Sequence, residues 1–385
     1  MAAVRTLESE SVPLTHALGR VLSEALRAST PLPPFDYSAM DGYALRTEDL
    51  GGPGPWELPV NGECRAGDSP RPLGEGEAAR IFTGAPLPFG ADAVVLQENV
   101  ARTEVGVRFD QPAAAFDNVR RAGADLAGGA IALEAGTRLG AFQLGLAAAL
   151  DRDQVQVTRR PRVVVAPTGN ELRAPGSASR PGSIPDSNSV ALMALCALAG
   201  ADARLAPRLS DDTATTAAAF RDLFGTCDLL VTVGGVSVGD HDVVRPALVE
   251  AGARIEFWKV ALRPGKPLVF GQAGRTLILG LPGNPVSAQL TFALFGMPLV
   301  RALQGDGKPL PSPLRVQLAE PLRQRPGRLG VYRACLEGNR ARINSNQASG
   351  STVSLAHAEA LVFVPKDSAE CAAGSELEAL RLAEL

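Results

Sequence analysis

The stretch DLLVTVGGVSVGDHD, residues 228–242, combines an apolar run, a glycine-rich turn and two carboxylates. The run 229–233 is apolar at four of its five positions, a pattern typical of a strand buried on both faces of a parallel sheet. Residues 243–252 are predicted to form a helix, with Asp242 at its N-cap and Gly252 just past its end. The stretch therefore predicts a strand–loop–helix unit of an open α/β sheet.

Such a unit places ligands at the carboxyl edge of the strands. Backbone N–H groups in a glycine-rich turn bind phosphate, and paired carboxylates hold a hard divalent cation against it. In this stretch the phosphate-binding candidates are Gly234, Gly235, Ser237 and Gly239. Asp240 and Asp242 are the candidate metal ligands. We interpret the stretch as a phosphate-and-metal site.

The same loop also matches G-x-S-x-G, the nucleophile elbow of serine hydrolases, with Ser237 as the nucleophile. Such a serine needs a histidine base. His241 is too close in sequence to act as that base, and His357 lies in a segment that looks structural. The hydrolase interpretation is kept as a rival.

The composition limits the class of protein. A chain of 385 residues is long enough for two to four domains, and an apolar fraction of 45% excludes a disordered chain. A net charge of −3 with both signs interspersed argues against a nucleic-acid-binding surface. The five cysteines contain no C-x-x-C pair, and no apolar run reaches the length of a membrane span. We expect a soluble cytoplasmic protein without a membrane or nucleic-acid partner.

The order of predicted strands, helices and turns along the chain predicts a multidomain α/β plus β fold. Strands alternating with helices of ten or more residues define a central doubly wound α/β domain. Leucine spacing predicts helices at 4–28 and 140–150, which would pack together and make the β-rich region between them an insertion. The expected domains are a helical linking domain of 1–28 and 124–160, an inserted β-rich domain of 29–123, the α/β domain of 161–304, and a C-terminal small β-barrel domain of 305–385.

Three further loops of the α/β domain carry unusual residues. PTGNEL contains Glu171, and GLPGNP contains Pro282, Gly283, Asn284 and Pro285. The segment WKVALRPGKP carries the cations Lys259, Arg263 and Lys266. Each loop alone could be an ordinary turn, but four loops at neighbouring strand ends favour one shared site. None is a P-loop, and no G-x-G-x-x-G opens a helix, which disfavours a dinucleotide enzyme.

Taken in order, several motifs resemble those of the molybdopterin molybdotransferase family, whose members are MoeA-like proteins and the E domain of gephyrin. The motifs span residues 38–288: SAMDGYA, TGAPLPFGADAVV, RRAGAD, TGNEL, DSN, GGVSVGDHD, WK, RPGKP and GLPGNPVSA. The combination of SAMDGYA, GGVSVGD and GLPGNPVS is highly specific.

The resemblance implies a homodimeric enzyme whose central domain is molybdopterin-binding-like. It would take adenylylated molybdopterin and molybdate as substrates, insert molybdenum and release AMP in a Mg²⁺-dependent step. The active site would lie between the α/β domain of one subunit and the inserted domain of the other. A molybdopterin adenylyltransferase is a candidate partner.

The resemblance also assigns roles to individual residues. The matching functional residues of the reaction are Asp41, Thr83, Asp125, Glu171, Asp211, Asp242, Lys259 and Arg263, with Arg263 standing where the family commonly has lysine. Pro282 and Pro285 match the loop prolines, and Glu171 joins Asp240 and Asp242 as a metal candidate. Arg333 and Ser349 match the family's molybdate site only loosely.

Two other interpretations remain open within this resemblance. One is a non-enzymatic scaffold, which would not need the set of acids and cations. The other is a molybdopterin adenylyltransferase, which uses the α/β module alone and would not need SAMDGYA or the β domains.

Overall fold

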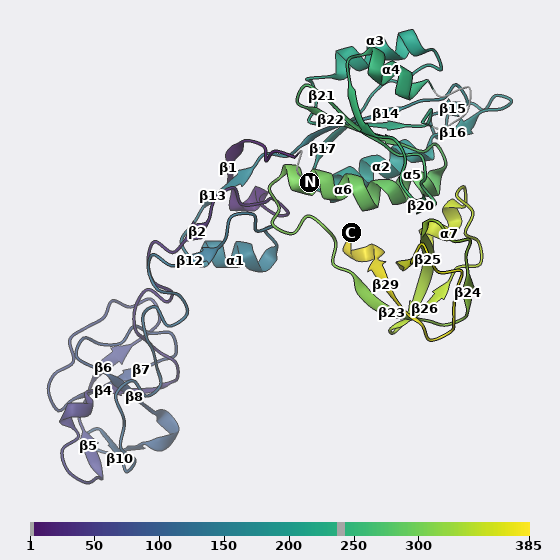
Figure 1. Ribbon diagram of the computed structural model, residues 1–385. Helices are drawn as coiled ribbons and strands as arrows, with labels where there is room; N and C mark the ends of the chain where they lie inside the picture. The colour runs from purple at the N-terminus through teal and green to yellow at the C-terminus, as the bar shows by residue number, and fades with distance from the viewer. Residues whose placement is uncertain (1–3, 237–242) are drawn as a thin grey trace.

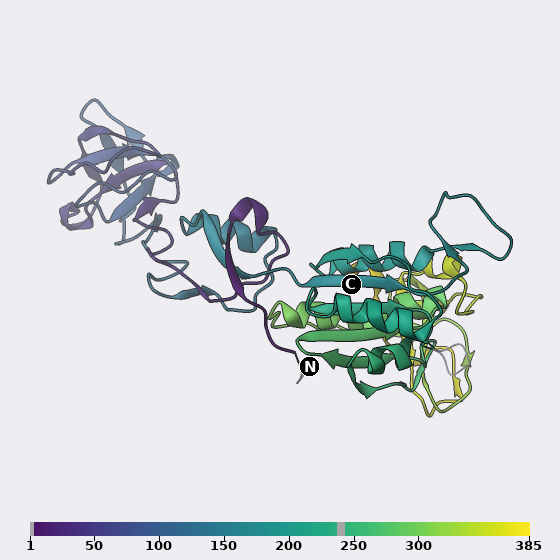
Figure 2. The same cartoon turned by 90° about the horizontal axis from the view of Figure 1, so that it is seen from above.

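The computed structural model describes residues 4–236 and 243–385. The chain is elongated, with a small β domain at one end and the α/β and C-terminal domains at the other (Figures 1 and 2). A linking region between them contains both the start of the chain and the segment that returns from the β domain. The β domain is therefore an insertion in the chain.

The linking region is built mostly from strand pairs that join its two segments. β1 (Ser9–Pro13) pairs antiparallel with β13 (Gln154–Thr158), and β2 (Leu26–Arg27) pairs with β12 (Ile131–Leu133). The predicted helix near residue 141 is confirmed as α1 (Ala141–Ala149).

The predicted helix over 4–28 is wrong, so the linking domain is not helical on that side. Only one 3₁₀ turn, Leu14–His16, occurs between β1 and β2 among the described residues. Val21 and Leu22 are buried, but Leu18 is 63% exposed, so the leucine spacing does not define one buried helix face. Pairing with distant strands has overridden the local helical pattern.

The inserted domain contains a four-stranded sheet in the order β6-β7-β4-β8 and a three-stranded sheet in the order β5-β10-β9. The strands are β4 (Gly42–Leu45), β5 (Trp56–Leu58), β6 (Val60–Cys64), β7 (Ala78–Ile81), β8 (Ala93–Leu96), β9 (Ala101–Arg102) and β10 (Val107–Phe109). A short pair, β3 (Tyr37–Ser38) with β11 (Val119–Arg120), closes the domain toward the linking region, and 3₁₀ turns cover Thr47–Asp49 and Gln97–Asn99.

The α/β domain has a six-stranded sheet in the order β17-β14-β18-β22-β21-β19. The strands are β14 (Arg162–Pro167), β17 (Asp202–Leu205), β18 (Leu229–Val233), β19 (Arg254–Phe257), β21 (Val269–Ala273) and β22 (Thr276–Leu281). β14, β17, β18 and β22 are parallel, and β21 is antiparallel to both of its neighbours. The predicted doubly wound sheet with β18 fully buried is confirmed.

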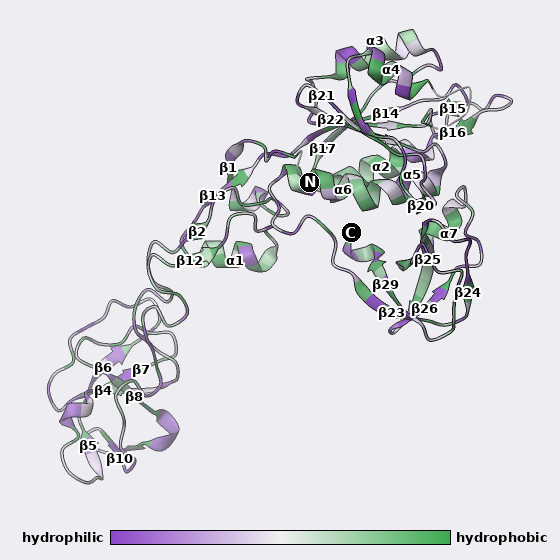
Figure 3. Ribbon diagram, in the orientation of Figure 1, coloured by the Kyte–Doolittle hydropathy of each residue, from purple (hydrophilic) through white to green (hydrophobic). Residues whose placement is uncertain are grey.

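Helices cover both faces of this sheet, as Figure 1 shows. The helices are α2 (Ser187–Leu198), α3 (Thr213–Leu223), α4 (Val244–Glu250), α5 (Pro285–Thr291) and α6 (Met297–Leu303). One core contains side chains of α2, α5 and α6, and a second contains side chains of α3 and α4. Figure 3 shows the apolar residues concentrated along α2, α5 and α6. Two short strands, β15 (Leu172–Arg173) and β16 (Ile184–Pro185), pair beyond the sheet.

α5 and α6 form one continuous helix through a π-helical turn, Phe292–Gly296. Residues 285–303 have a mean hydropathy of 1.4, which would suffice for a membrane span by length and composition. However, 72% of the segment is buried within the protein, which identifies it as a core helix of the α/β domain.

The C-terminal domain is a closed barrel, as predicted. Its five strands pair in the order β25 (Leu329–Glu337), β26 (Arg340–Ile343), β23 (Leu314–Leu318), β29 (Glu376–Arg381) and β27 (Ala360–Val364). The barrel closes because β27 also pairs with β25. β20 (Leu262–Arg263), which comes from the α/β domain, adds to β25 in parallel and joins the two domains. The remaining elements are α7 (Thr352–Ala356), the pair β24 (Leu322–Arg323) and β28 (Glu370–Cys371), and a final 3₁₀ turn, Leu382–Glu384.

Candidate functional site

Three parallel strands end at the same level. Pro167 of β14 pairs in register with Val233 of β18, and Val233 pairs with Leu281 of β22. The loops that follow them therefore start side by side at the carboxyl edge, where ligands bind in open α/β sheets. Two backbone hydrogen bonds hold the ends of these strands together. The N–H of Thr168 donates to the carbonyl oxygen of Val233, and the N–H of Gly234 donates to the carbonyl oxygen of Leu281.

The loop after β18 approaches its neighbours too closely for any side chain. Gly234 and Gly235 have φ values of 89° and 64°, the left-handed region that favours glycine. A Cβ at Gly234 would lie 2.7 Å from the carbonyl oxygen of Thr168, and one at Gly235 would lie 2.7 Å from a methyl group of Val244. α4 begins after Val243, which makes no side-chain cap, and Asp242, the predicted N-cap, lies outside the described residues.

A cavity of about 710 Å³ opens between these loops. This volume is within the range of small-molecule sites. Eight residues predicted for the functional site line it: Glu171, Asp211, Gly234, Gly235, Pro282, Gly283, Asn284 and Pro285. The sequence-based grouping of the PTGNEL, GGVSVGD and GLPGNP loops around one cavity is thus supported by their position.

Acidic and polar side chains dominate one wall of the cavity. The N–H of Asn170 donates to Asp211 Oδ2 at 3.1 Å, which ties the Glu171 loop to the start of α3. Asp186 caps α2 by accepting from the N–H of Ser189 at 3.0 Å. Asp212, the neighbour of Asp211, caps α3 through Thr215 in the same way. Asp211 thus faces the cavity while Asp212 stabilises the helix.

Two residues of the cavity were missed as site residues by the sequence analysis. Asn188 is 8% exposed, and its Nδ2 donates to the carbonyl oxygen of Gly283 at 2.8 Å. Among the described residues its buried Oδ1 has no hydrogen-bond partner, and neither has Oγ1 of Thr168. Buried acceptors without a partner are costly, so both atoms are poised to accept hydrogen bonds from a ligand. The motif DSN was the only sequence signal for Asn188.

The predicted cations occupy the rim rather than the lining. Lys259, Arg263 and Lys266 are all exposed and do not line the cavity, although the segment reaches it at Pro267. Trp258 holds two cations against its ring: Lys259 Nζ lies 3.8 Å and the Arg245 guanidinium 4.1 Å from the ring centroid. This arrangement fixes Lys259 at the carboxyl edge of the sheet.

Ser349 of the barrel domain joins the loop of the α/β domain. Its hydroxyl accepts a hydrogen bond from Asn284 Nδ2 at 3.0 Å, and its carbonyl oxygen accepts one from the N–H of Val286. Ser349, a predicted molybdate-site residue, therefore lies beside the GLPGNP loop, a neighbour that the sequence analysis does not assign to it.

Arg333, predicted for the molybdate site, is buried inside the barrel domain and not exposed to a ligand. Its side chain is fully buried, and its guanidinium donates to Ser354 Oγ and to the carbonyl oxygens of Asn346 and Ala348 at 2.9 to 3.2 Å. Burial lowers the pKa of this guanidinium. Arg333 thus supports the loop that carries Ser349 from behind.

The other predicted acids lie in the inserted domain and its junction. The N–H and the hydroxyl of Thr83 both donate to Asp41 Oδ1 at 2.8 Å, so these two predicted residues are brought together across 42 positions. Asp125 is exposed at the junction with the linking region, where its N–H donates to Leu32. Within one chain the inserted domain stands far from the α/β cavity (Figures 1 and 2).

Four of the predicted residues lie outside the described part of the chain: Ser237, Gly239, Asp240 and Asp242. His241, weighed as a hydrolase base, lies there too. Within 4–236 and 243–385, no group of three His, Cys, Asp or Glu side chains is arranged to hold a metal.

Comparison with known families covers nearly all of the chain. A profile described as MoeA N-terminal region (domain I and II) matches residues 1–150. One described as probable molybdopterin binding domain matches 164–302, and one described as MoeA C-terminal region (domain IV) matches 315–382. The class of protein is therefore a multidomain chain with an α/β domain of the molybdopterin-binding type.

Relatives agree over the full length. A Mycobacterium tuberculosis protein named molybdopterin molybdenumtransferase 2 is 38% identical, over 97% of this chain and 95% of its own. A Nostoc molybdopterin molybdenumtransferase is 35% identical, over 97% and 89%. The crystal structure of the molybdopterin biosynthesis MoeA protein from Pyrococcus horikoshii has a TM-score of 0.84 at 32% identity, over 98% and 95%. The chain belongs to the MoeA family.

A first prediction concerns Arg333. Its replacement in Arg333→Met removes the donors to the carbonyls of the 346–348 loop, so Ser349 should lose its fixed position. We expect faster hydrogen exchange at the Val286 amide and a barrel destabilised by about 1–3 kcal/mol. Arg340→Met, an exposed arginine of the same barrel, is the control. Equal exchange at Val286 in both variants would contradict the supporting role.

A second prediction concerns the charge of Asp41. The N–H of Thr83, and then its hydroxyl, lower the pKa of Asp41. The lowered pKa means that the Asp41 carboxylate stabilises the folded state. This stabilisation is fully present above the pKa that Asp41 has in the unfolded chain, and it is lost as the pH falls through the pKa of the folded protein. Thr83→Ala should raise the pKa of Asp41 part of the way to its ordinary value, as measured by NMR titration of the carboxyl carbon.

The control for that titration is Thr103→Ala, because the hydroxyl of Thr103, in the same domain, accepts a hydrogen bond from the N–H of Gly106 and makes none to Asp41. An unchanged pKa of Asp41 in Thr83→Ala would mean that the hydroxyl makes no contribution beyond that of the backbone N–H.

Proposed function

We propose that this protein is a molybdopterin molybdenumtransferase, which inserts molybdenum from molybdate into adenylylated molybdopterin and releases AMP. The observation that carries the proposal is the in-register set of three loops around one cavity, in a chain that matches two MoeA profiles and a molybdopterin-binding profile over most of its length. Full-length relatives with that name at 35–38% identity support it.

The residues of the cavity suit a phosphate-bearing substrate. Loop N–H groups beside Gly234 and Gly283 can bind phosphate oxygens, and the buried acceptors of Asn188 and Thr168 can bind N–H donors of a pterin ring. Cleavage of a phosphoric anhydride depends mainly on positioning and charge neutralisation. Lys259, with its neighbours on the rim, would supply counter-charge to AMP and to doubly negative molybdate.

A magnesium ion is compatible with the residues present. Mg²⁺ usually takes one or two carboxylates and completes its shell with waters and substrate phosphates, so it needs no dense protein cluster. Glu171 lines the cavity and would hold it, together with Asp242 or Asp240. When bound, the ion would neutralise charge on the phosphoryl group. Mg²⁺ dependence is part of the proposal.

We also propose that the site is completed by a second copy of the chain. Asp41 and Thr83 belong to the inserted domain, which lies far from the α/β domain of its own chain (Figure 1), so they can act at that cavity only from a partner. α1 supports pairing between copies, because it is uncharged and exposes Phe142 at 91% together with Ala141, Gly145 and Ala148. An apolar face of this kind favours burial in an interface.

The setting of the reaction is a further part of the proposal. We place it in the cytoplasm, where thiols stay reduced: the five cysteines are all free, and burial raises the pKa of Cys196 to about 12 and of Cys227 to about 11. A molybdopterin adenylyltransferase would supply the adenylylated substrate and is the proposed partner.

The direct test is incubation with adenylylated molybdopterin, Mg²⁺ and molybdate, followed by assay for AMP. Glu171→Gln and Asp242→Asn should each lower AMP release by about 100-fold or more while keeping the fold, because each removes charge that positions the phosphoryl group. Glu134→Gln, an exposed site of the linking region, should stay near the wild-type rate. Near-normal release by Glu171→Gln would remove that residue from the site.

Subunit mixing tests the shared site. Asp41→Asn and Glu171→Gln should each be inactive alone. If the site joins two chains, a mixed dimer contains one intact site, and a refolded equal mixture should regain about a quarter of wild-type activity. No recovery, with mixed dimers demonstrated by mass spectrometry, would show that the residues do not act across subunits.

The rival functions give different results in these assays. A scaffold of the same family would release no AMP. A serine hydrolase would react through Ser237 with a fluorophosphonate probe, and its proposed base, His357, is exposed in the barrel domain just after α7. A molybdopterin adenylyltransferase would not depend on Asp41.

A further inference from the structure

A second cavity, of about 850 Å³, lies at the opposite edge of the α/β sheet. Its walls are the N-terminal segment 5–8, the starts of β14 and β18, the turn between β21 and β22, and the end of α6 at Leu303. These are the amino ends of the same parallel strands whose carboxyl ends carry the candidate active site. The second cavity is therefore separated from that site by the length of the sheet.

Arginines line this cavity. The five are Arg5, Arg159, Arg162, Arg254 and Arg275, against two carboxylates, Glu8 and Asp228. The cavity thus has an excess of three positive charges, whereas the whole chain has a net charge of −3. All of its cations are guanidinium groups, and each can donate two parallel N–H hydrogen bonds to two oxygens of a phosphate.

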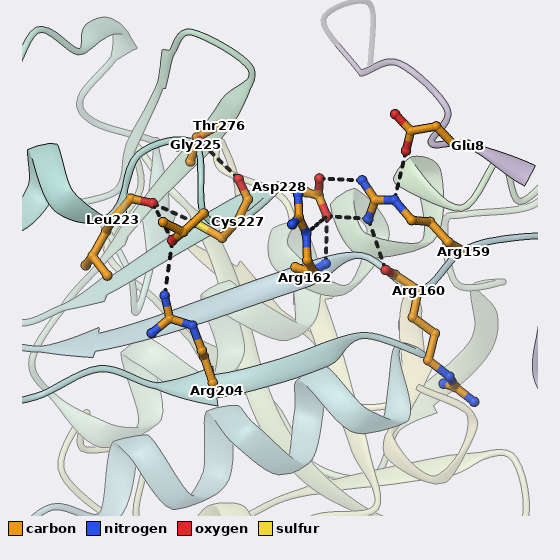
Figure 4. Close-up of polar contacts among 11 residues, drawn as sticks. Glu8, Arg159, Arg160, Arg162, Arg204, Leu223, Gly225, Cys227, Asp228 and Thr276 are labelled. Atoms are coloured by element: carbon orange, nitrogen blue, oxygen red, sulfur yellow. Dashed lines mark hydrogen bonds and ion pairs between the residues drawn. The ribbon is translucent and has the colours of Figure 1, made fainter.

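Asp228 organises one wall of the cavity (Figure 4). Both Nη atoms of Arg159 donate to it at 2.7 and 2.8 Å, and the N–H of Arg162 donates at 2.7 Å. Burial alone would raise the pKa of Asp228, but these bonds outweigh it and hold the pKa below its ordinary value. Arg159 also donates through Nε to Glu8 at 2.8 Å. Arg162 is also ion-paired with Asp228, with its Nε 3.7 Å from Oδ2. Arg159 and Arg162 are thereby matched by the two carboxylates, and Arg5, Arg254 and Arg275 carry the excess charge.

A purely structural role does not account for those remaining arginines. Elsewhere at this edge, Arg160 donates to the carbonyl oxygen of Gly200 after α2, as expected for cations at helix C-termini. By contrast, Arg5 and Arg275 make no side-chain hydrogen bond or ion pair with the described residues. Arg254 pairs only with the neighbouring Glu256 at 2.6 Å, and its side chain is 77% exposed.

We propose that this cavity binds a small phosphate-bearing anion on Arg254 and Arg275. Arg254 is on β19, which pairs with β21, and Arg275 is in the turn that follows β21. These two guanidinium groups can bind such an anion without displacing any bond of the Asp228 network. Leu7, Leu277 and Leu303 provide an apolar floor beside them, which would also accommodate a nucleobase. The shared chemistry is the phosphate group, and its source is either free inorganic phosphate or a nucleotide.

Calorimetric titration of the full-length protein at low ionic strength tests this site, with pyrophosphate, AMP and adenosine as probes. The informative variant is Arg254→Gln/Arg275→Gln. The control, Arg315→Gln/Arg323→Gln, removes two exposed arginines of the barrel domain, which pair with Glu378 and Glu370. Both variants change the net charge equally, so long-range electrostatic effects are matched.

We expect saturable binding of a phosphate-bearing probe, weakened by about tenfold or more in the cavity variant and by less than about twofold in the control. Within the binding that the cavity variant loses, a higher affinity for AMP than for pyrophosphate would identify a nucleotide, and the reverse would identify a free phosphate anion. Adenosine should not bind. Equal affinity in both variants, or no saturable binding of either phosphate probe, would overturn the proposal. AMP release from adenylylated molybdopterin, measured in parallel, reports on the other site independently.

Discussion

The common level at which β14, β18 and β22 end is the constraint on which the rest of this structure depends. Pairing of Pro167 with Val233 and of Val233 with Leu281 starts three loops side by side. The loops then pack backbone against backbone, and only glycine fits at positions 234 and 235. A slip of one residue in either pairing would reverse which face each side chain points to and would separate the loops. The cavity is thus a property of sheet register.

Much of the α/β domain and its loops could be predicted because the decisive signals are local. The apolar run of β18 and the turn chemistry of GLPGNP are readable without knowledge of distant contacts. The segment 4–28 could not be read this way. Its leucines repeat at helical spacing, but its backbone bonds go to strands more than a hundred residues away. Local propensity is a weak guide where such long-range pairing decides the conformation.

The site could be predicted in outline and not in detail. Family motifs predict Asp41, Glu171 and the proline loop as site residues, and of these Glu171 and the proline loop line the cavity. The structure adds the contacts that support the loops. Asn188 holds Gly283, and Arg333 holds the loop of Ser349 from a fully buried position. Neither support has a spacing signature, because each joins segments that only the fold brings together. The Asp228 network at the opposite edge is hidden in sequence for the same reason.

The most direct test of the account is hydrogen exchange of the protein with and without adenylylated molybdopterin. The account predicts slower exchange in the three loops at 167–172, 233–236 and 282–285, and in the inserted domain around Asp41 if a second chain completes the site. Protection confined to other segments, with the three carboxyl-edge loops unchanged, would contradict the assignment of this cavity as the substrate site.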